Sequence, residues 1–217
     1  MGNQAASPER PTGCLLNRCG DATACQGDGL SAHHRSWSAA YYAVVFYRDE
    51  EELAEQVSEY LLPAIQDGGV AIVVATAGHR RSFEGHLAGM GVDVAAASAR
   101  GFYLAPDASE TMRGFMVADR PDPAGFWQAI SPMLRQAAEA GRPVRVFGEM
   151  VALLWDAGLI DAAIEVEAMW NELGAQYPFS LLCAYPAQPA ACADQLDALT
   201  EVCRAHTQVT GVPPEAD

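Results

Sequence analysis

The sequence predicts an α/β fold in three layers, with a mostly parallel β-sheet covered by helices on both faces. Three mainly apolar runs support this prediction, at residues 70–75, 144–147 and 179–184, and the first of them is continuous. Strands that are covered on both faces have this pattern, without regular polar alternation. Segments with apolar residues at helical spacing separate the runs. Strands that alternate with helices favour parallel pairing, because each helix carries the chain back across the sheet.

The first strand is expected at residues 41–47, and a helix follows it. Asp49 and the three glutamates after it place negative charge at the positive end of a helix dipole. Asp67-Gly68-Gly69 ends this helix, because glycine tolerates the left-handed backbone of a helix C-terminus. The apolar side of the helix is formed by Leu53, Val57, Tyr60, Leu61 and Ile65.

The middle of the chain continues the alternation. A helix is expected at residues 79–90, and two short apolar segments, 92–97 and 101–104, are candidate strands, of which no more than one is expected at the centre of the sheet. Asp107 fits a helix N-cap, and Glu110 stands three residues later, as in a capping box. A short helix is therefore expected to begin at Asp107.

The second half of the sequence predicts three further helices around the strands at 144–147 and 179–184. They are expected at residues 123–140, 161–173 and 190–206. Between the first two of them, another helical segment follows the strand at 144–147 and is broken by Gly158. The inward side of the helix at 161–173 is expected to comprise Ile164, Ala168, Trp170 and Leu173.

Composition divides the chain into three parts. Residues 1–36 are rich in small and polar residues with little periodicity and predict a flexible extension that contains cysteines. Residues 37–207 form the α/β domain. Residues 208–217, with two prolines and a glycine, predict a flexible tail.

Charge and hydropathy exclude several classes of protein. A net charge of −15 argues against direct nucleic-acid binding, which needs lysine and arginine against phosphates. We expect no membrane span, because no apolar stretch approaches the roughly 20 residues required. No basic segment leads into an apolar run near the N-terminus, so we expect a cytoplasmic protein with reduced cysteines.

The turn after the first strand does not fit a phosphate-binding loop. A P-loop needs glycines and a lysine there, so that backbone N–H groups cradle the phosphates. This turn contains Arg48-Asp49-Glu50 instead, and the whole chain has no lysine. We therefore expect no ATP binding of the P-loop kind, and no dinucleotide motif is present at this turn either.

Polar side chains directly after the apolar runs predict a small-molecule site, because ligands bind at the carboxyl ends of strands in open α/β sheets. Glu149 follows the run at 144–147, where it could bind a ligand, pair with Arg80, or simply cap the next helix. His79 and Arg80 follow another run and could donate to a ligand or hold an anion.

Three more residues are assigned to this site from their places at strand ends. Cys183 and Tyr185 end the run at 179–184, and Tyr47 ends the first strand. Cys183 could act as a nucleophile if His79 were close enough to be its base; burial as a small apolar residue is the alternative. The full expected ligand site is Tyr47, His79, Arg80, Glu149, Cys183 and Tyr185, gathered around one common hollow.

The N-terminal cysteines raise a metal hypothesis. Cys14 and Cys19 have four residues between them and Cys19 and Cys25 have five, whereas zinc ribbons and fingers favour pairs with two to four residues between them, so that only the first pair reaches this range. Incidental thiols in a flexible segment are the favoured interpretation, and a zinc or iron–sulfur site is the alternative.

Several segments together resemble a known family, the MEDS domain, a methanogen/methylotroph sensory domain first described in a regulator of dichloromethane metabolism. The resemblance covers roughly residues 41–206, and the longest matching block is residues 147–155, Phe-Gly-Glu-Met-Val-Ala-Leu-Leu-Trp. The other matching segments, in the same order as in the family, are residues 45–47, 73–80, 107–112, 170–173 and 179–185.

The resemblance implies a RecA/KaiC-like α/β domain with a degenerate P-loop. It also implies a role in sensing small molecules next to transcription-factor, histidine-kinase or anti-sigma modules. We recognise no output module in the chain, so we expect it to act on a regulatory partner protein, or to use its own N-terminal extension as the added element. Two alternatives stay open: an enzyme that uses Glu149 or Cys183 with His79, and a pure interaction module whose cleft is a relic.

Overall fold

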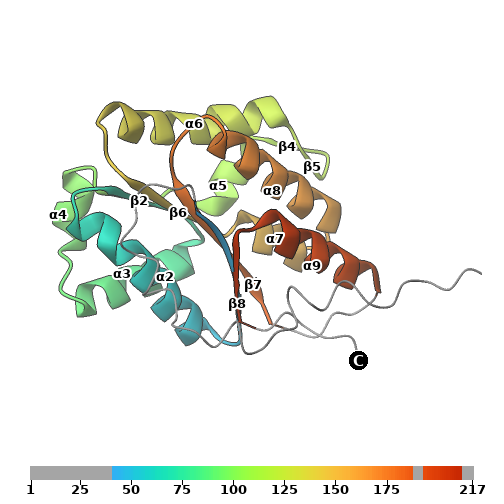
Figure 1. The fold of residues 1–217 in the computed structure, drawn as a ribbon, viewed down its shortest axis with the longest axis horizontal. Coiled ribbons are helices and arrows are strands. Elements are labelled where there is room, and N and C mark those ends of the chain that lie inside the picture. The colour runs from blue at the N-terminus through green and yellow to red at the C-terminus, as the bar shows by residue number, and fades with distance from the viewer. Residues whose placement is uncertain (1–40, 188–192, 212–217) are drawn as a thin grey trace, which may run out of the picture.

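The computed structural model describes residues 41–187 and 193–211. The predicted extension at 1–36, with Cys14, Cys19 and Cys25, lies outside the described residues. The described chain forms three layers: a central sheet, with helices on each face (Figure 1). The α/β class, the three layers and the parallel sheet expected from the sequence are therefore confirmed.

Six strands form the central sheet, and all of their pairings are parallel. Their order across the sheet is β3-β2-β6-β7-β1-β8, so β1 lies beside the last two strands of the chain. The strands are β1 (Tyr42–Tyr47), β2 (Val70–Val74), β3 (Tyr103–Leu104), β6 (Val144–Gly148), β7 (Ser180–Pro186) and β8 (Gln208–Thr210). A separate antiparallel hairpin joins β4 (Met116–Val117) and β5 (Arg120–Pro121).

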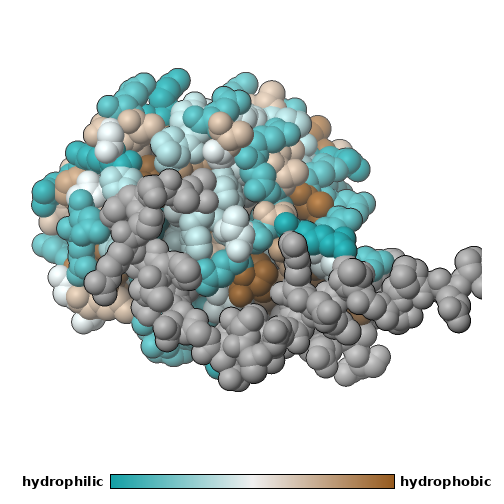
Figure 2. All heavy atoms as spheres, viewed as in Figure 1, coloured by the Kyte–Doolittle hydropathy of each residue, from teal (hydrophilic) through white to brown (hydrophobic). Residues whose placement is uncertain are grey.

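The helices divide between the two faces, and each face has its own apolar core. One core lies under α2 (Glu50–Gln66), α3 (Ala77–Gly89) and α4 (Val94–Ala99). The other core contains the buried residues of α5 (Ala108–Arg113), α6 (Pro123–Glu139), α7 (Met150–Asp156), α8 (Ile160–Gly174) and α9 (Ala193–Ala205). The outer surface in view carries many hydrophilic side chains, in line with the charged composition (Figure 2).

The alternation of side chains along a strand decides which core each residue joins. In β1, Tyr42, Val44 and Phe46 belong to the core under α5–α9, and Tyr47 belongs to the core under α2–α4. In β7, Cys183 and Tyr185 point to the α5–α9 side. The sheet therefore separates Tyr47 from both of them.

Two helices begin where the sequence predicts, because an aspartate whose side chain accepts hydrogen bonds from backbone N–H groups precedes each of them. Asp49 caps α2 by accepting from the N–H of Glu52 at 2.9 Å. Asp107 caps α5 by accepting from the N–H of Glu110 at 3.0 Å, as predicted. Each bond satisfies a donor that the helix itself leaves without a partner.

Three expectations about local structure are wrong. Residues 92–97 are not a strand: Asp93 caps helix α4 there, by accepting from the N–H of Ala96 at 2.9 Å. The predicted flexible tail at 208–217 begins with strand β8, which pairs with β1. On helix α8, Trp170 and Leu173 are buried as predicted, but Ala168 is exposed and Glu167 is buried.

Candidate functional site

The carboxyl ends of β1, β2 and β6 lie at one edge of the sheet, because these strands are parallel. Val74 of β2 is in register with Gly148 of β6, and the two strands end together. The connections after β2 and β6 leave towards opposite faces, since α3 and α7 belong to different cores. Such a divergence is where α/β sheets place their ligands.

Glu149 joins the end of β6 to the start of α3. Its Oε2 accepts a hydrogen bond of 2.6 Å from the backbone N–H of Thr76, the N-cap residue of α3. Its own backbone N–H donates to the carbonyl of Val74 at 2.9 Å. Its side chain makes no capping bond to α7, the helix that it precedes. The interpretation of Glu149 as a cap of its own helix is therefore wrong, because the carboxylate turns to the neighbouring strand end.

His79 lies between two carboxylates. Its Nδ1 is 2.8 Å from Oε1 of Glu149, and its Nε2 contacts Oε2 of Glu50 at the start of α2. The first contact is a close ion pair rather than a well-aligned hydrogen bond. The side chain is 19% exposed, and its ring stacks on that of Phe83 with centroids 5.7 Å apart.

The surroundings of His79 keep its imidazole protonated at neutral pH. The pKa of His79 is raised from 6.5 to about 9, chiefly through its contact with the Glu149 carboxylate. Partial burial works in the opposite direction, and the negative charges of Glu149 and Glu50 add to the increase. The site therefore presents an imidazolium held by two carboxylates.

Tyr47 and Asp156 complete the group that we call the His79 site: Tyr47, Glu50, His79, Glu149 and Asp156. Burial raises the pKa of the Tyr47 hydroxyl, and the nearby charges of Glu50, Asp156 and Glu149 raise it further. Burial also raises the pKa of Asp156 in α7, with a contribution from Glu149. The imidazolium of His79 thus contacts two carboxylates, and Asp156 adds a third acidic side chain near Glu149.

Arg80 lies next to this site but pairs elsewhere. Its guanidinium donates to the carbonyl of Ala105 at 2.9 Å and to Oδ2 of Asp107 at 3.0 Å. The expected pairing of Arg80 with Glu149 is therefore wrong. Since the other oxygen of Asp107 caps α5, one carboxylate ties α3 to α5.

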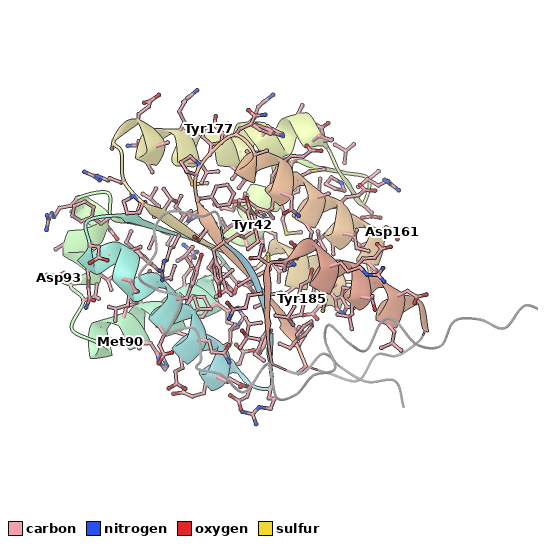
Figure 3. The ribbon with its side chains drawn as sticks, in the orientation of Figure 1. Tyr42, Met90, Asp93, Asp161, Tyr177 and Tyr185 are labelled. Atoms are coloured by element: carbon pink, nitrogen blue, oxygen red, sulfur yellow. The ribbon has the colours of Figure 1, made fainter. Side chains whose placement is uncertain are left out.

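Cys183 and Tyr185 do not share a hollow with His79. Both are fully buried on the opposite side of the sheet, in the core under α5–α9 (Tyr185 is labelled in Figure 3). The expectation of one common hollow is therefore wrong, because alternation in β7 points these two side chains away from the His79 site. For the same reason His79 cannot serve as a base for Cys183.

Cys183 and Tyr185 contact Glu167 of α8 instead. The Tyr185 hydroxyl donates to Oε1 of Glu167 at 2.9 Å, and the Cys183 thiol donates to Oε2 at 3.3 Å. Nε2 of His206, just after α9, lies 3.4 Å from the same Oε2. Burial and the Glu167 charge raise the pKa values of Cys183 and Tyr185 well above their usual range.

Sequence reasoning missed Glu50, Asp156, Glu167 and His206. Glu50 was explained by the helix dipole, which it also satisfies at the first position of α2. Glu167 had a signal: it lies between the buried Ala163 and Trp170 at helical spacing, where an acid is unusual. His206 and Asp156 stand at helix ends, where polar residues are ordinary.

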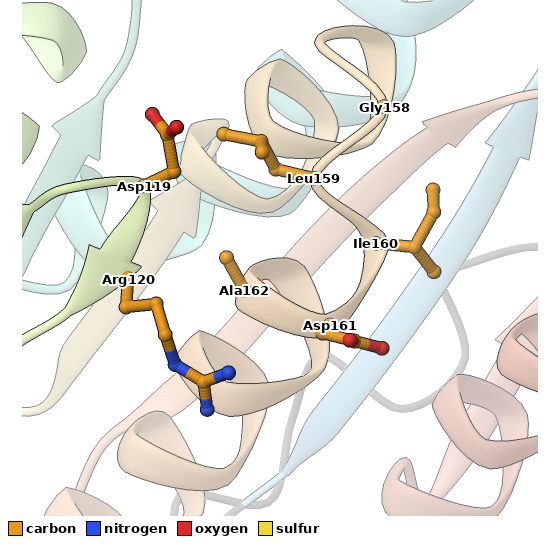
Figure 4. Close-up of a pocket in the computed structure, with 7 residues that line it drawn as sticks. All are labelled: Asp119, Arg120, Gly158, Leu159, Ile160, Asp161 and Ala162. Carbon is orange, nitrogen blue, oxygen red and sulfur yellow. The ribbon is translucent and has the colours of Figure 1, made fainter.

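A surface pocket lies apart from both groups. It has a volume of about 260 Å³ and is lined by the β4–β5 hairpin, the turn between α7 and α8 and the start of α8 (Figure 4). Arg120 at its rim is paired with Glu165 of α8. None of the six predicted site residues lines it. Its lining residues are Asp119, Arg120, Gly158, Leu159, Ile160, Asp161 and Ala162.

The fold and the charged strand-end site define a three-layer α/β domain with ionisable side chains at the carboxyl edge of a parallel sheet. Comparison with protein families supplies the particular assignment. The family model described as MEDS, the MEthanogen/methylotroph, DcmR Sensory domain, matches residues 43–207. The chain therefore belongs to the MEDS family of sensory domains, as its sequence motifs indicate, and a sensory or regulatory role follows from this membership.

Two further findings bear on the class of protein. A search of curated proteins finds no match. Within residues 41–187 and 193–211, no helix combines the length and the apolar character that crossing a bilayer requires.

Proposed function

We propose that this chain is a non-enzymatic, cytoplasmic sensory domain that binds a small molecule at the His79 site. Binding would be signalled to a regulatory partner protein such as a kinase, an anti-sigma factor or a transcription factor. Membership of a sensory family supports the role. The observation that carries the site is the protonated His79 between Glu149 and Glu50 at the carboxyl ends of three strands.

The charges of the His79 site favour a ligand that donates hydrogen bonds or carries positive charge. Both ring nitrogens of His79 already contact carboxylates, and a third acidic side chain, Asp156, interacts with Glu149. A donor from the ligand would replace one of these contacts. An anionic ligand would meet repulsion from the remaining carboxylates.

We infer further that the domain is RecA/KaiC-like and that its P-loop has degenerated. The connection from β1 to α2 supports this, because it offers no lysine and no glycine. Its helix start is already occupied by the Asp49 carboxylate, and Glu50, Glu51 and Glu52 follow. Negative charge there opposes phosphate binding at the helix N-terminus, so ATP is not the expected ligand.

The link between Glu149 and Thr76 provides a route from ligand to output. A ligand that draws Glu149 away from Thr76 removes an acceptor from the start of α3. A ligand can shift a conformational equilibrium only by binding one state more tightly than the other. We therefore expect α3 and the Arg80–Asp107 pair to respond first.

Native mass spectrometry of the full chain, isolated gently from its own cells, tests this proposal. We expect a small-molecule adduct on the wild type that Glu149→Gln loses, while Arg120→Gln at the surface pocket keeps it. Loss in Arg120→Gln alone would move the site to that pocket and contradict the proposal. Chemical conversion of the bound molecule that requires His79 and Glu149 would favour the enzymatic alternative. Partner regulation that persists in Glu149→Gln without ligand would favour the relic-cleft interaction module.

A further inference from the structure

Three different ligand types meet inside the α5–α9 core, from three separate elements. Glu167 comes from α8, Cys183 from β7, and His206 from the residue that follows α9. One ligand atom from each lies within 4.8 Å of the other two. The side chains of Glu167 and His206 are only 3% and 1% exposed, and Cys183 is fully buried.

Two of the distances in this group are close to the edges of a tetrahedral zinc site, and the third lies within 4.8 Å. Zinc binds sulfur at about 2.3 Å and nitrogen or oxygen at about 2.0–2.1 Å, so the edges measure about 3.6 Å from sulfur to oxygen and about 3.4 Å from nitrogen to oxygen. The Sγ of Cys183 lies 3.3 Å from Oε2 of Glu167, and Nε2 of His206 lies 3.4 Å from the same oxygen. The second distance exceeds that of an ordinary N–H···O hydrogen bond.

The neighbours of these side chains orient them as metal ligands are usually oriented. Nδ1 of His206 is 2.7 Å from the carbonyl oxygen of Val202, so this nitrogen carries the proton and can leave Nε2 with a lone pair. The Tyr185 hydroxyl holds Oε1 of Glu167 at 2.9 Å, which leaves Oε2 to the shared centre. Protein metal sites commonly fix their histidines and carboxylates through such outer contacts.

We propose that Glu167, Cys183 and His206 form a buried zinc site. Mixed sulfur, nitrogen and oxygen donors at tetrahedral spacing suit Zn²⁺. On binding, the Cys183 thiol releases its proton to solvent and the thiolate bonds to the metal. Oε2 of Glu167 and Nε2 of His206 supply the second and third ligands.

The zinc would fasten the C-terminal segment to the sheet. His206 lies between α9 and β8, and β8 pairs with β1 at the edge of the sheet. A zinc ion bound by His206, Cys183 and Glu167 would therefore link these three elements. Zinc occupancy would in this way be coupled to the docking of α9 and β8. This proposal does not depend on ligand binding at the His79 site, which lies at the carboxyl edge of the sheet.

Cobalt(II) is the probe, because its bonds to thiolate give an absorption band in the near ultraviolet that zinc lacks. The starting protein is the full chain with Cys14, Cys19, Cys25 and Cys192 changed to serine, so that only Cys183 and Cys203 remain. We expect one equivalent of cobalt to give the thiolate band, and one equivalent of zinc to abolish it. The further change Cys183→Ser should remove the band, whereas Cys203→Ser, at the other buried cysteine, should keep it.

Two milder variants keep the test decisive if Cys183→Ser fails to fold. Tyr185→Phe removes only an outer contact and should weaken zinc binding about 10–100-fold. Glu167→Gln keeps an acceptor for Tyr185 and should weaken binding by more than Tyr185→Phe does. Absence of the band in the folded starting protein, or a band that survives Cys183→Ser, overturns the proposal. Equal zinc affinity in the starting protein and Glu167→Gln overturns it as well.

Discussion

The carboxylate of Glu149 accepts a hydrogen bond from the backbone N–H of Thr76 at 2.6 Å, although 73 residues separate them along the chain. The bond crosses from the end of β6 to the start of α3. A charged acceptor aimed at a backbone N–H is stronger than a neutral one. Glu149 therefore fixes the place where α3 begins, and with it the position of His79.

Replacing Glu149 with glutamine should lower the pKa of His79 from about 9 towards 6.5. The change removes the negative charge and the contact that contribute most to the raised pKa, while an amide oxygen remains to accept from Thr76. NMR titration of the His79 ring measures the pKa directly. Glu51→Gln is the control, since Glu51 lies on the same helix as Glu50 but contacts His86. An unchanged His79 pKa in Glu149→Gln would show that Glu149 does not set it.

The stability of the domain should fall as the pH rises through 9. Because the pKa of His79 is raised on folding, its contribution is complete below the unfolded value of 6.5 and is lost as the pH passes about 9. At about 1.4 kcal/mol per pKa unit, this contribution is on the order of 3 kcal/mol at most.

Urea unfolding of the wild type and of His79→Gln between pH 6 and 9.5 measures this contribution. The difference between the two free energies of unfolding should shrink steadily across that range, because other titrating groups affect both proteins alike. A difference that stays constant with pH would mean that His79 stabilises the fold by packing on Phe83 rather than by its charge.

The Arg80–Asp107 pair should show a measurable coupling energy. Both side chains are about one-quarter exposed, and the guanidinium also donates to the Ala105 carbonyl. A double-mutant cycle with Arg80→Met and Asp107→Asn should give a coupling of about 1 kcal/mol. The control cycle is Arg113 with Glu110 in α5, whose side chains are 72% and 74% exposed; it should give a much smaller value. Equal couplings in both cycles would contradict a structural role for Arg80.

Gly174→Ala should destabilise the domain by about 1–3 kcal/mol through overpacking. A Cβ at Gly174, the last residue of α8, would overlap the side chain of Tyr42, which is buried in the core under α5–α9. Gly89→Ala is a matched control, because Gly89 ends α3 in the same way but a Cβ there meets nothing within 4 Å.

For Gly89→Ala we expect a gain of up to about 1 kcal/mol from helix propensity. Urea unfolding of both variants gives the comparison. Similar free energies for the two variants would indicate that Tyr42 moves aside freely. Tyr42→Phe should rescue Gly174→Ala only in part. It removes the hydroxyl that the new methyl group would meet, but the ring also lies in the path of that group.

The sequence was sufficient to predict the helices and strands that depend on residues close together in the chain. Asp49 and Asp107 begin helices as expected, because the capping residue and the N–H groups that it satisfies are neighbours in the chain. It misled at residues 92–97, where the apolar residues favoured a strand but Asp93 caps a short helix. Tertiary packing decides between these states when a segment is that short.

By itself, the sequence determined the α/β class, the family and the strand ends that carry polar side chains, since all of these depend on composition and on order along the chain. Only the tertiary structure decided which of those side chains meet. The alternation of side chains along β7 is a local property. The contact of Cys183 with Glu167, however, depends on the pairing of β7 with β1 and β6 and on the orientation of α8 about its axis. Long-range pairing thus sends Glu149 to His79 and Cys183 to Glu167, because residues far apart in sequence become neighbours only when the sheet forms.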